Sequence, residues 1–528
     1  MEEYLKRSVG ERIAALRRER GLSLSELAER AGVSKSTLYE IEMGRVAPSV
    51  TTLWKIANAL EVGFGALVPE WVLVSERSVD VLLIERGDGF EAYLMRLKPY
   101  AVHVSRPHVG VVSEYVFVAK GAAVVGPVDS PIFLREGEAT EFPGNVPHFY
   151  APFGGETRLI VRLVYAQKES AELPLGVRVV KRPPGPLGLW SSGDVRDFGT
   201  TRGRYIYRSF WAEVEIAPWL SEIHKRLLQS LKSIDVETLK KYAEEDGPLK
   251  FLAVETLAYF GIYMDVNVSV GSAETTFGEI FSPAHYARYE VYHPGYGRQI
   301  VYINELVERL GVREVLDVGT GPGYHLFYRA DCVEPEAAFW EMLKGKCRQV
   351  LKEFDVSRSY DAVVAMGSPH RIGIEVFLEK VSAVLKSGGF LIVADEFPGE
   401  FEDEEERVIN VARHHAAYVL DIWPRDVDPA LAVPLLEIYL ARDMARVVEH
   451  AAAFRAGLEL AQGHPFVEFA KLEALSMYLG MMYYEEKKTH LAEFVRLAKS
   501  AGFRLVEKSR VYHTYGDGGT YVLLFERV

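Results

Sequence analysis

The sequence predicts a multidomain protein in which an all-α segment, an all-β barrel and an α/β domain follow one another along 528 residues. Three observations predict this fold class. Apolar residues recur at helical spacing over residues 8–68, β-rich runs separated by Gly, Pro and Asp fill residues 70–166, and strand and helix patterns alternate after residue 290. One hydrophobic core cannot serve a chain of this length, since single domains hold roughly 100–200 residues.

Composition and charge narrow the class of protein. The chain is 48% hydrophobic and 26% charged, without an apolar run near the roughly 20 residues of a membrane span and without the apolar core of a signal peptide. We therefore expect a cytoplasmic protein that contacts no membrane. The net charge of −13 argues against extensive contact with nucleic acid, whereas the first 69 residues carry ten Lys and Arg against nine Asp and Glu. Any DNA contact is expected in that segment.

The rare residue types give two further indications. Five Asn and five Gln are few for this length, as is typical of thermophilic sources. The two cysteines, Cys332 and Cys347, predict neither a disulfide framework nor a metal finger.

Residues 1–69 are predicted to form a helical domain. Ser23 is a natural N-cap, and Glu26, three positions later, completes a capping box. Gly32 ends that helix and Ser34 caps the next. Two helices joined by "AGVS" form a helix-turn-helix, whose second helix can enter the major groove of DNA.

The stretch "LRRERGLSLSELAERAGVSKSTLYEIEMGRVAPSVTTLWKIANALEV" resembles the Cro/C1 (XRE) repressor domains. The resemblance implies that double-stranded DNA is a partner and that the chain is a homodimer, because such domains read paired half-sites. It implies an internal ion pair between Arg17 and Glu42. It also implies a set of residues that face DNA, with the last approaching phosphate: Ser34, Lys35, Ser36, Thr37, Glu40 and Arg45. The alternative is a helical bundle used only for dimerisation.

Residues 70–167 are predicted to form the β-barrel. The segments "PHVGVVSEYVFVAKG" and "GEATEFPGNVPH" resemble the two cupin motifs, in which three histidines and one glutamate bind a divalent metal. The resemblance implies His108, Glu114 and His148 as ligands. Gly110 stands where another histidine is usual, and His103 is a substitute only if its strand bends. The barrel therefore holds either a three-ligand metal site or a pocket for a small-molecule effector, or serves only as a scaffold for dimerisation.

Residues 168–289 are predicted to be a linker and a helical region. Pro and Gly are frequent over residues 181–204, which favours a linker. Helical patterns run from about residue 210 to residue 263, and they carry no motif that indicates a chemistry.

Residues 290–528 alternate four predicted strands, "REVLDVG", "CVEPE", "YDAVVAMG" and "GGFLIVADEF", with helical runs, which predicts a parallel sheet covered by helices. The final helix and a hairpin closed through "GDGG" predict an antiparallel edge. A helical insertion at about residues 402–487 is expected to cover the substrate side of the sheet. Only ten residues separate Gly323 from Glu334, so the helix between the first two strands is expected to have about two turns.

The loop "VLDVGTGPGYH" with the later "AGFRLVE" resembles the class I S-adenosylmethionine-dependent methyltransferases, which have a Rossmann-like fold. The resemblance implies S-adenosyl-L-methionine as cofactor. Asp317 would lie near its methionine end, Glu334 would accept hydrogen bonds from the ribose, and the glycines would let it approach the backbone. The predicted cofactor-binding residues are Asp317, Gly319, Gly321, Gly323, Glu334 and Asp361.

Methyl transfer needs little beyond in-line positioning, so no diagnostic catalytic side chain is expected. His370 is the one candidate for a general base. It ends "MGSPH", which stands where amino-methylating DNA enzymes carry "[DN]PP[YF]", so DNA is not the expected acceptor. The apolar and aromatic content of the insertion, as in "SMYLGMMYYEE", favours a small-molecule acceptor. The sequence therefore predicts a DNA-binding transcriptional regulator with a cupin-like sensor and a methyltransferase domain. Two alternatives remain: a methyltransferase that regulates its own operon, and a non-catalytic regulator that senses the cofactor or uses the domain as a scaffold.

Overall fold

The computed structural model describes residues 2–69, 73–165, 178–180, 236–259, 262–264, 283–424, 426–461, 463–482, 486 and 488–528. The predicted linker at 181–204 and the helical patterns of residues 210–235 lie outside the described residues. The chain divides into two compact units, one of residues 1–187 with 448–459 and one of residues 188–447 with 460–528. The second unit thus extends N-terminal to the predicted boundary at residue 290. No helix of the described residues is long and apolar enough to cross a membrane.

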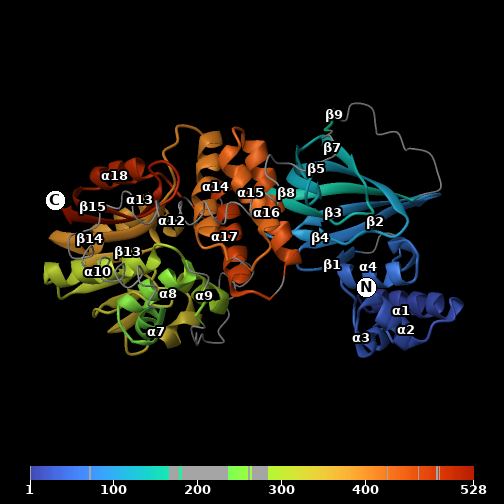
Figure 1. Ribbon diagram of the computed structural model, residues 1–528, viewed down its shortest axis with the longest axis horizontal. Coiled ribbons are helices and arrows are strands. Elements are labelled where there is room, and N and C mark those ends of the chain that lie inside the picture. Colours follow the sequence, from blue (N-terminus) through green and yellow to red (C-terminus); the bar gives the residue numbers. More distant parts are fainter. Residues whose placement is uncertain are drawn as a thin grey trace. The chain divides into compact units, whose positions relative to one another are not determined.

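The N-terminal unit begins with the predicted helical domain (Figure 1), made of α1 (Glu2–Glu19), α2 (Leu24–Ala31), α3 (Lys35–Glu42), α4 (Val50–Ala59) and the short η1 (Phe64–Ala66). The predicted capping box is confirmed, because the Ser23 hydroxyl accepts from the Glu26 N–H while the Glu26 carboxylate accepts from the Ser23 N–H. Gly32 ends α2 at φ 60°, a left-handed conformation that favours glycine. Local signals therefore set these helix boundaries.

A nine-stranded sheet follows in the same unit, in the path order β1-β2-β3-β8-β5-β7-β9, with β4 paired to β8 and β6 to β5. The strands are β1 (Leu73–Ser75), β2 (Val79–Gly87), β3 (Phe90–Leu97), β4 (His103–Ser105), β5 (Val111–Pro127), β6 (Ile132–Arg135), β7 (Glu138–Phe142), β8 (His148–Tyr165) and β9 (Arg178–Val179). The first half of β5 pairs with β7 and its second half with β6. The register shifts at Lys120, beside Gly121, whose φ is +82°. The two halves of this long strand therefore pair with different neighbouring strands.

The helical domain and the sheet share one continuous hydrophobic core. Phe64 of η1 meets Tyr93 of β3 edge-on, and the Gly65 N–H donates to the Glu91 carboxylate at 3.0 Å. The two predicted domains of this unit are thus packed together as one body.

The C-terminal unit contains the predicted α/β sheet, in the order β12-β11-β10-β13-β14-β16-β15. Its strands are β10 (Val315–Val318), β11 (Asp331–Val333), β12 (Gln349–Leu351), β13 (Tyr360–Met366), β14 (Leu385–Phe397), β15 (Phe503–His513) and β16 (Gly519–Arg527). The first five strands in this order are parallel, and β16 and β15 form the predicted antiparallel edge. The parallel sheet and its final hairpin are therefore confirmed.

Two details of this sheet differ from expectation. The short strand β12 was not predicted, since "QVL" has no strand-length apolar pattern. The expected two-turn helix between β10 and β11 is wrong, because residues 319–330 form only turns. The glycines at 319, 321 and 323 all have φ between 55° and 68°, so the chain turns repeatedly and no helix starts.

Helices cover both faces of the sheet (Figure 1). Helix α10 (Tyr296–Leu310) contacts β14, β15 and β16, and α13 (Ile374–Val384) and α18 (Leu491–Ser500) pack together on the opposite face. The shorter helical elements are η2 (Ala337–Phe339), α11 (Trp340–Leu343), α12 (Pro369–Ile372) and η3 (Pro429–Ala432). The remaining helices are α7 (Val236–Glu244), α8 (Leu249–Tyr259), α9 (Pro283–Tyr292), α14 (Glu404–Asp421), α15 (Val433–Leu440), α16 (Met444–Leu460) and α17 (Pro465–Met482). In the insertion α14 packs on α17, and α17 on α9.

The two cysteines form a disulfide, contrary to the expectation from sequence. Cys332 lies in β11 and Cys347 just before β12, and the parallel pairing of these strands brings their Cα atoms to 6.0 Å. A separation of 15 residues carries no sequence signal for such an approach. Closing a loop of this size stabilises a fold by roughly 3 kcal/mol in the chain-entropy account.

Candidate functional sites

The predicted DNA-facing residues lie at the start of α3, where Ser34, Lys35, Ser36 and Thr37 are all exposed. The Ser34 hydroxyl accepts from the Thr37 N–H at 3.0 Å and so caps the helix. The Arg45 Nη1 donates to the Glu40 Oε1 at 3.2 Å, and both side chains are at least partly exposed to solvent. The sequence reading missed Tyr39, which is 44% exposed on the same helix with Arg45 over its ring at 5.8 Å.

The predicted ion pair of this domain is confirmed. Arg17 Nε and Nη2 donate to the two carboxylate oxygens of Glu42 at 2.6 and 2.7 Å. Both side chains are largely buried, and the bidentate geometry joins α1 to the end of α3. The pair is structural and takes no part in the exposed face.

The three predicted metal ligands come together at the nine-stranded sheet, which is the region predicted as a barrel and is called the barrel below. His108, Glu114 and His148 are buried, and one donor atom from each lies within 4.8 Å of the others. The Glu114 Oε2 atom is 3.4 Å from His148 Nε2 and 3.9 Å from His108 Nε2. Among the described residues, Glu114 Oε2, His148 Nε2 and His108 Nδ1 have no hydrogen-bond partner.

Neighbouring groups orient two of these side chains. The His148 Nδ1–H donates to the Val146 carbonyl at 2.8 Å, which leaves the Nε2 lone pair facing Glu114. The Tyr150 hydroxyl donates to Glu114 Oε1 and leaves Oε2 for a cation. Burial raises the pKa of Glu114 to about 8 and lowers the pKa of His148 to about 4, so the site carries little charge of its own.

His103 does not join this group. Its Nδ1 bonds the Ser78 hydroxyl at 2.9 Å and lies 3.3 Å from Glu76. Gly110 has a φ of +77° at the turn before β5, a conformation that is uncommon for residues other than glycine. The structure therefore brings three of the candidate ligand side chains together, and His103 is not one of them.

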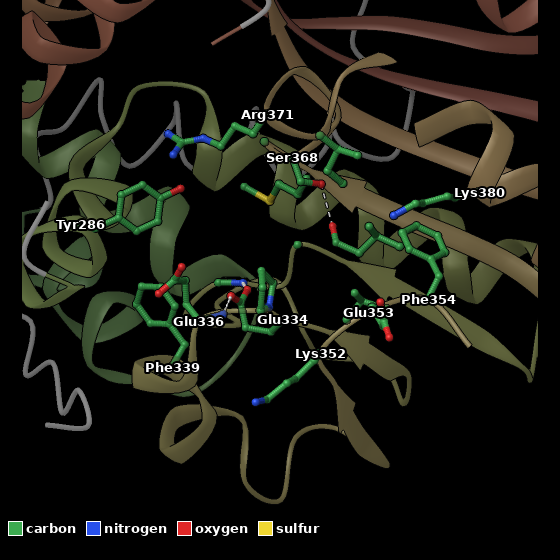
Figure 2. A pocket seen from close by; sticks show the side chains of 18 of the residues that line it. Tyr286, Glu334, Glu336, Phe339, Lys352, Glu353, Phe354, Ser368, Arg371 and Lys380 are labelled. Carbon is green, nitrogen blue, oxygen red and sulfur yellow. Dashed lines mark hydrogen bonds between the residues drawn. The ribbon is translucent and has the colours of Figure 1, made fainter. Parts of the chain in front are cut away.

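A pocket in the C-terminal unit lies at the carboxyl ends of β10, β11, β12 and β13, on both sides of the point where the strand order reverses. Tyr286 and Arg371 stand at one end, Glu353, Phe354 and Lys380 at the other, with Glu334 between them (Figure 2). Ligands of open α/β sheets bind at such a crevice.

Three of the predicted cofactor-binding residues line this pocket, namely Gly319, Gly321 and Glu334. A Cβ at Gly319 would lie 2.4 Å from the Ser368 Cβ, so only glycine lets the loops after β10 and β13 meet. The Glu334 carboxylate accepts from the Gly321 N–H at 2.6 Å and from the Glu336 N–H at 2.8 Å. Burial raises the pKa of Glu334 to about 7.

Two other predicted residues lie behind the loop. Asp317 is buried, and its Oδ2 accepts from the Tyr328 hydroxyl at 2.7 Å and pairs with His325 Nε2 at 2.8 Å. Gly323 packs against Leu343, which a Cβ would meet at 2.5 Å. The role of Asp317 at a methionine end stays a prediction.

The prediction for Asp361 is wrong. Strand β13 begins at Tyr360 and ends at Met366, so Asp361 lies at its amino end, away from the pocket at the carboxyl end. Its carboxylate accepts from the Arg313 and Glu314 N–H groups and pairs with Lys386 at 2.6 Å. These bonds, with the Glu314 N–H first, lower the pKa of Asp361 to about 2.

The sequence reading missed the pocket residues that follow β12, Lys352, Glu353 and Phe354, because it missed the strand. It also missed Tyr286 on α9, for which no local motif exists. His370, the candidate base, is buried and turned toward Asp395, whose carboxylate lies 2.8 Å from Nδ1. The pocket is lined instead by Ser368 and Arg371 on either side of it.

A second buried cluster, which we call the ionic cluster, consists of His293, Glu396, His415, Glu473 and Lys488. Lys488 Nζ lies 2.5 Å from Glu396 and 2.9 Å from His415 Nε2, and His415 Nδ1 lies 2.5 Å from Glu473. His293 Nε2 lies 3.0 Å from Glu396 and 3.5 Å from Glu473. The cluster ties α14 and α17 to the carboxyl end of β14.

The charges of the ionic cluster compensate one another. Burial disfavours a charge on His293, but the carboxylates of Glu396 and Glu473 raise its pKa to about 9. Lys488 and His293 in turn hold the pKa of Glu396 well below its usual range, against the effect of burial. The cluster therefore contains its own cations.

Known proteins resemble parts of the chain. A helix-turn-helix family profile, HTH_3, matches residues 13–67. The HTH-type transcriptional regulator SutR of Escherichia coli K12 is 32% identical over 165 residues, which are 29% of this chain and 93% of that protein. An HTH_3 family transcriptional regulator from Vibrio cholerae aligns in structure over 32% of this chain and all of its own, at 27% identity and a TM-score of 0.28. A cupin_2 domain of an XRE family regulator from Enterobacter cloacae aligns over 17% of this chain and 99% of its own, at 22% identity and a TM-score of 0.16.

Proposed function

Because the chain belongs to the helix-turn-helix family of transcriptional regulators and binds DNA as such, we propose that it is a homodimeric regulator whose C-terminal unit binds S-adenosyl-L-methionine and methylates a small-molecule acceptor. We propose further that its cupin-like barrel holds a divalent metal ion. The DNA contacts proposed for α3 are Ser34, Lys35, Ser36, Thr37 and Glu40, with Arg45 on phosphate.

One observation carries the proposal for the cofactor: the glycine turn after β10 and the carboxylate of Glu334 after β11 face the same pocket. Gly319 and Gly321 have no side chain and let a ligand approach the backbone. The Glu334 carboxylate oxygens can accept hydrogen bonds from the hydroxyls of a ribose. The residues that line the pocket extend from Phe354 and Lys380 on one side to Tyr286 and Arg371 on the other (Figure 2), with Glu334 between them. The residues present therefore fit the cofactor.

S-adenosyl-L-methionine would supply an electrophilic methyl group. The chain's own residues would hold and orient it: Gly319 and Gly321 through close backbone approach, Glu334 through hydrogen bonds to the ribose. Since orientation supplies much of the rate in such a displacement, no acid or base at the reacting atom is required. His370, bonded to Asp395, would orient the loop after β13.

The test is calorimetric titration of the full chain with S-adenosyl-L-methionine. We expect micromolar binding that Gly321→Asp abolishes, since the new carboxylate would enter the pocket beside Glu334, and a Cβ at this position already lies 3.6 Å from Glu290 Oε1. Gly311→Asp is the matched control: Gly311 also has a positive φ, of 61°, but caps α10 with open space around its Cβ position. Absence of binding by the wild-type chain would leave a regulator with a methyltransferase-like scaffold.

A separate observation supports metal in the barrel. Glu114 Oε2 and His148 Nε2 are buried, lie 3.4 Å apart and lack hydrogen-bond partners among the described residues, and His108 Nε2 lies 3.9 Å from the same Glu114 oxygen. Unpaired buried polar atoms are costly, and a divalent cation bound between these three side chains would satisfy Glu114 Oε2 and His148 Nε2. Zinc titration followed by competition with a chromophoric chelator tests the site, and His148→Ala should lower the affinity at least 100-fold. Equal zinc binding by both proteins would place the metal elsewhere.

A further inference from the structure

Helix α4 of the DNA-binding domain contacts the barrel beside the candidate metal ligands. Its residues Thr51, Trp54 and Asn58 are spaced three and four apart, so they lie on one face of the helix. The Trp54 indole stacks on the His108 imidazole, with ring centroids 3.9 Å apart and planes inclined by 29°. One candidate ligand is thus packed directly against the DNA-binding domain.

Asn58 holds the backbone on both sides of the same ligand. Its Nδ2 donates to the Pro107 carbonyl at 3.2 Å, and its Oδ1 accepts from the Val109 N–H at 3.4 Å. The N–H of His108 itself donates to the Gly144 carbonyl of the barrel at 3.0 Å. The ligand therefore takes its position from both domains.

Thr51 anchors the start of α4 to the same barrel. Its N–H donates to Glu76 Oε2 at 2.9 Å, and its hydroxyl donates to the same carboxylate at 3.0 Å. Together with the shared hydrophobic core, these bonds connect α4 to the barrel, so that α4 contacts both the DNA-binding domain and the candidate ligands. A change at His108 cannot be confined to the barrel.

We propose that Trp54 and Asn58 are positioning residues for His108, so that metal binding in the barrel and DNA binding by the same chain are thermodynamically linked. The inference rests on the proposed metal site. Partners of a metal ligand fix its ring orientation, and their loss typically lowers metal affinity 10–100-fold. A bound cation would immobilise His108 and, through α4, the DNA-binding domain. Ordering that domain in advance tightens DNA binding, and linkage makes the two effects reciprocal.

The first experiment measures zinc affinity of the full chain by chelator competition. We expect Trp54→Ala to bind zinc 10–100-fold more weakly and Trp54→Phe to retain most of the affinity through its remaining ring. Lys55→Ala is the control, since it lies one residue along α4 and so about 100° around the helix. Thermal melting of Trp54→Phe checks that the fold is intact. Wild-type zinc affinity in Trp54→Ala would overturn the inference while leaving the metal site in place.

The second experiment measures DNA affinity with and without zinc, on a duplex selected from a random library by the full chain. Zinc should tighten binding at least fivefold in the wild type, not in His148→Ala, and by a smaller factor in Trp54→Ala. An unchanged or weakened DNA affinity of the zinc-loaded wild type would overturn the linkage. Failure of the wild type to bind zinc at all would overturn the metal site and this inference together.

Discussion

Two buried groups of histidines and carboxylates in this chain differ in whether they contain their own cations. The ionic cluster of the C-terminal unit contains Lys488 and a His293 whose pKa is raised to about 9, and its donors and acceptors face one another at 2.5–3.5 Å. The barrel group of His108, Glu114 and His148 contains no lysine or arginine, and burial shifts the pKa values of Glu114 and His148 toward their neutral forms. Both groups contain polar atoms without a hydrogen-bond partner, so the internal cation is what distinguishes them.

The difference indicates which of the two groups would be stabilised by binding an external cation. Buried charges are tolerated when they are paired, so the ionic cluster supplies its own counter-charges and fixes the helical insertion to the sheet. The barrel group lacks a positive partner, and burial keeps it close to neutral. Composition alone does not separate a structural cluster from a binding site, but the presence or absence of an internal cation does.

The largest expected effect is removal of the internal cation. Lys488→Met leaves Glu396 buried without its closest partner, and we expect a loss of about 3–5 kcal/mol in the free energy of unfolding. Urea denaturation measures it, with the exposed Lys508→Met as control. The double variant Lys488→Met, Glu396→Gln should recover part of the loss, because both charges are then gone. A loss below 1 kcal/mol would show that the cluster does not depend on its lysine.

The pH dependence of the C-terminal unit should follow His293. Its pKa is raised in the folded state to about 9, from an unfolded value of about 6.5, so its contribution is complete below pH 6.5 and is lost as the pH rises through 9. The shift corresponds to about 3 kcal/mol. The difference in unfolding free energy between wild type and His293→Gln, measured from pH 6 to pH 10, should shrink over this window. A difference that is constant with pH would contradict a protonated His293.

Zinc should raise the stability of the barrel and leave the stability of the ionic cluster unchanged. At a concentration 100 times its dissociation constant, a ligand that binds only the folded state adds about 2.7 kcal/mol. Calorimetry should show an upward shift of the N-terminal transition in the wild type and in Lys488→Met, and none in His148→Ala. A shift that survives in His148→Ala would contradict the comparison.

The smallest effect is expected from neutralising a carboxylate in the metal-free barrel. Because burial raises the pKa of Glu114 to about 8, Glu114→Gln replaces one neutral group by another and should change stability by less than about 1 kcal/mol in the presence of a chelator. Glu473→Gln, the matched change in the ionic cluster, should cost about 3 kcal/mol or more. Similar losses in both variants would remove the distinction between the two groups.

The predictions from sequence agree best with the structure where the contacts that determine a feature are local. The capping box at Ser23 and Glu26, the end of α2 at Gly32 and the cap at Ser34 are set within four residues of chain, and each is found as predicted. The candidate metal ligands and the pocket loop were predicted from short motifs, because each motif depends on residue types within a few positions of one another.

It failed where the answer depends on the pairing of distant segments. The end of β13 on which Asp361 lies, the existence of β12 and the approach of Cys332 to Cys347 all follow from strand register across the sheet. No single strand records that register in its own residues.

By itself, then, the sequence determined the order of helical, β-rich and α/β segments, the helix caps, the glycine turn and the chemical identity of the candidate ligands, because these depend on near neighbours and residue type. Only the tertiary structure decided which ligands converge, that His103 is used elsewhere, and that the charges of the ionic cluster compensate. It also decided that Trp54 stacks on His108. Those outcomes depend on distances between residues far apart in the chain, which packing of the core fixes and composition does not.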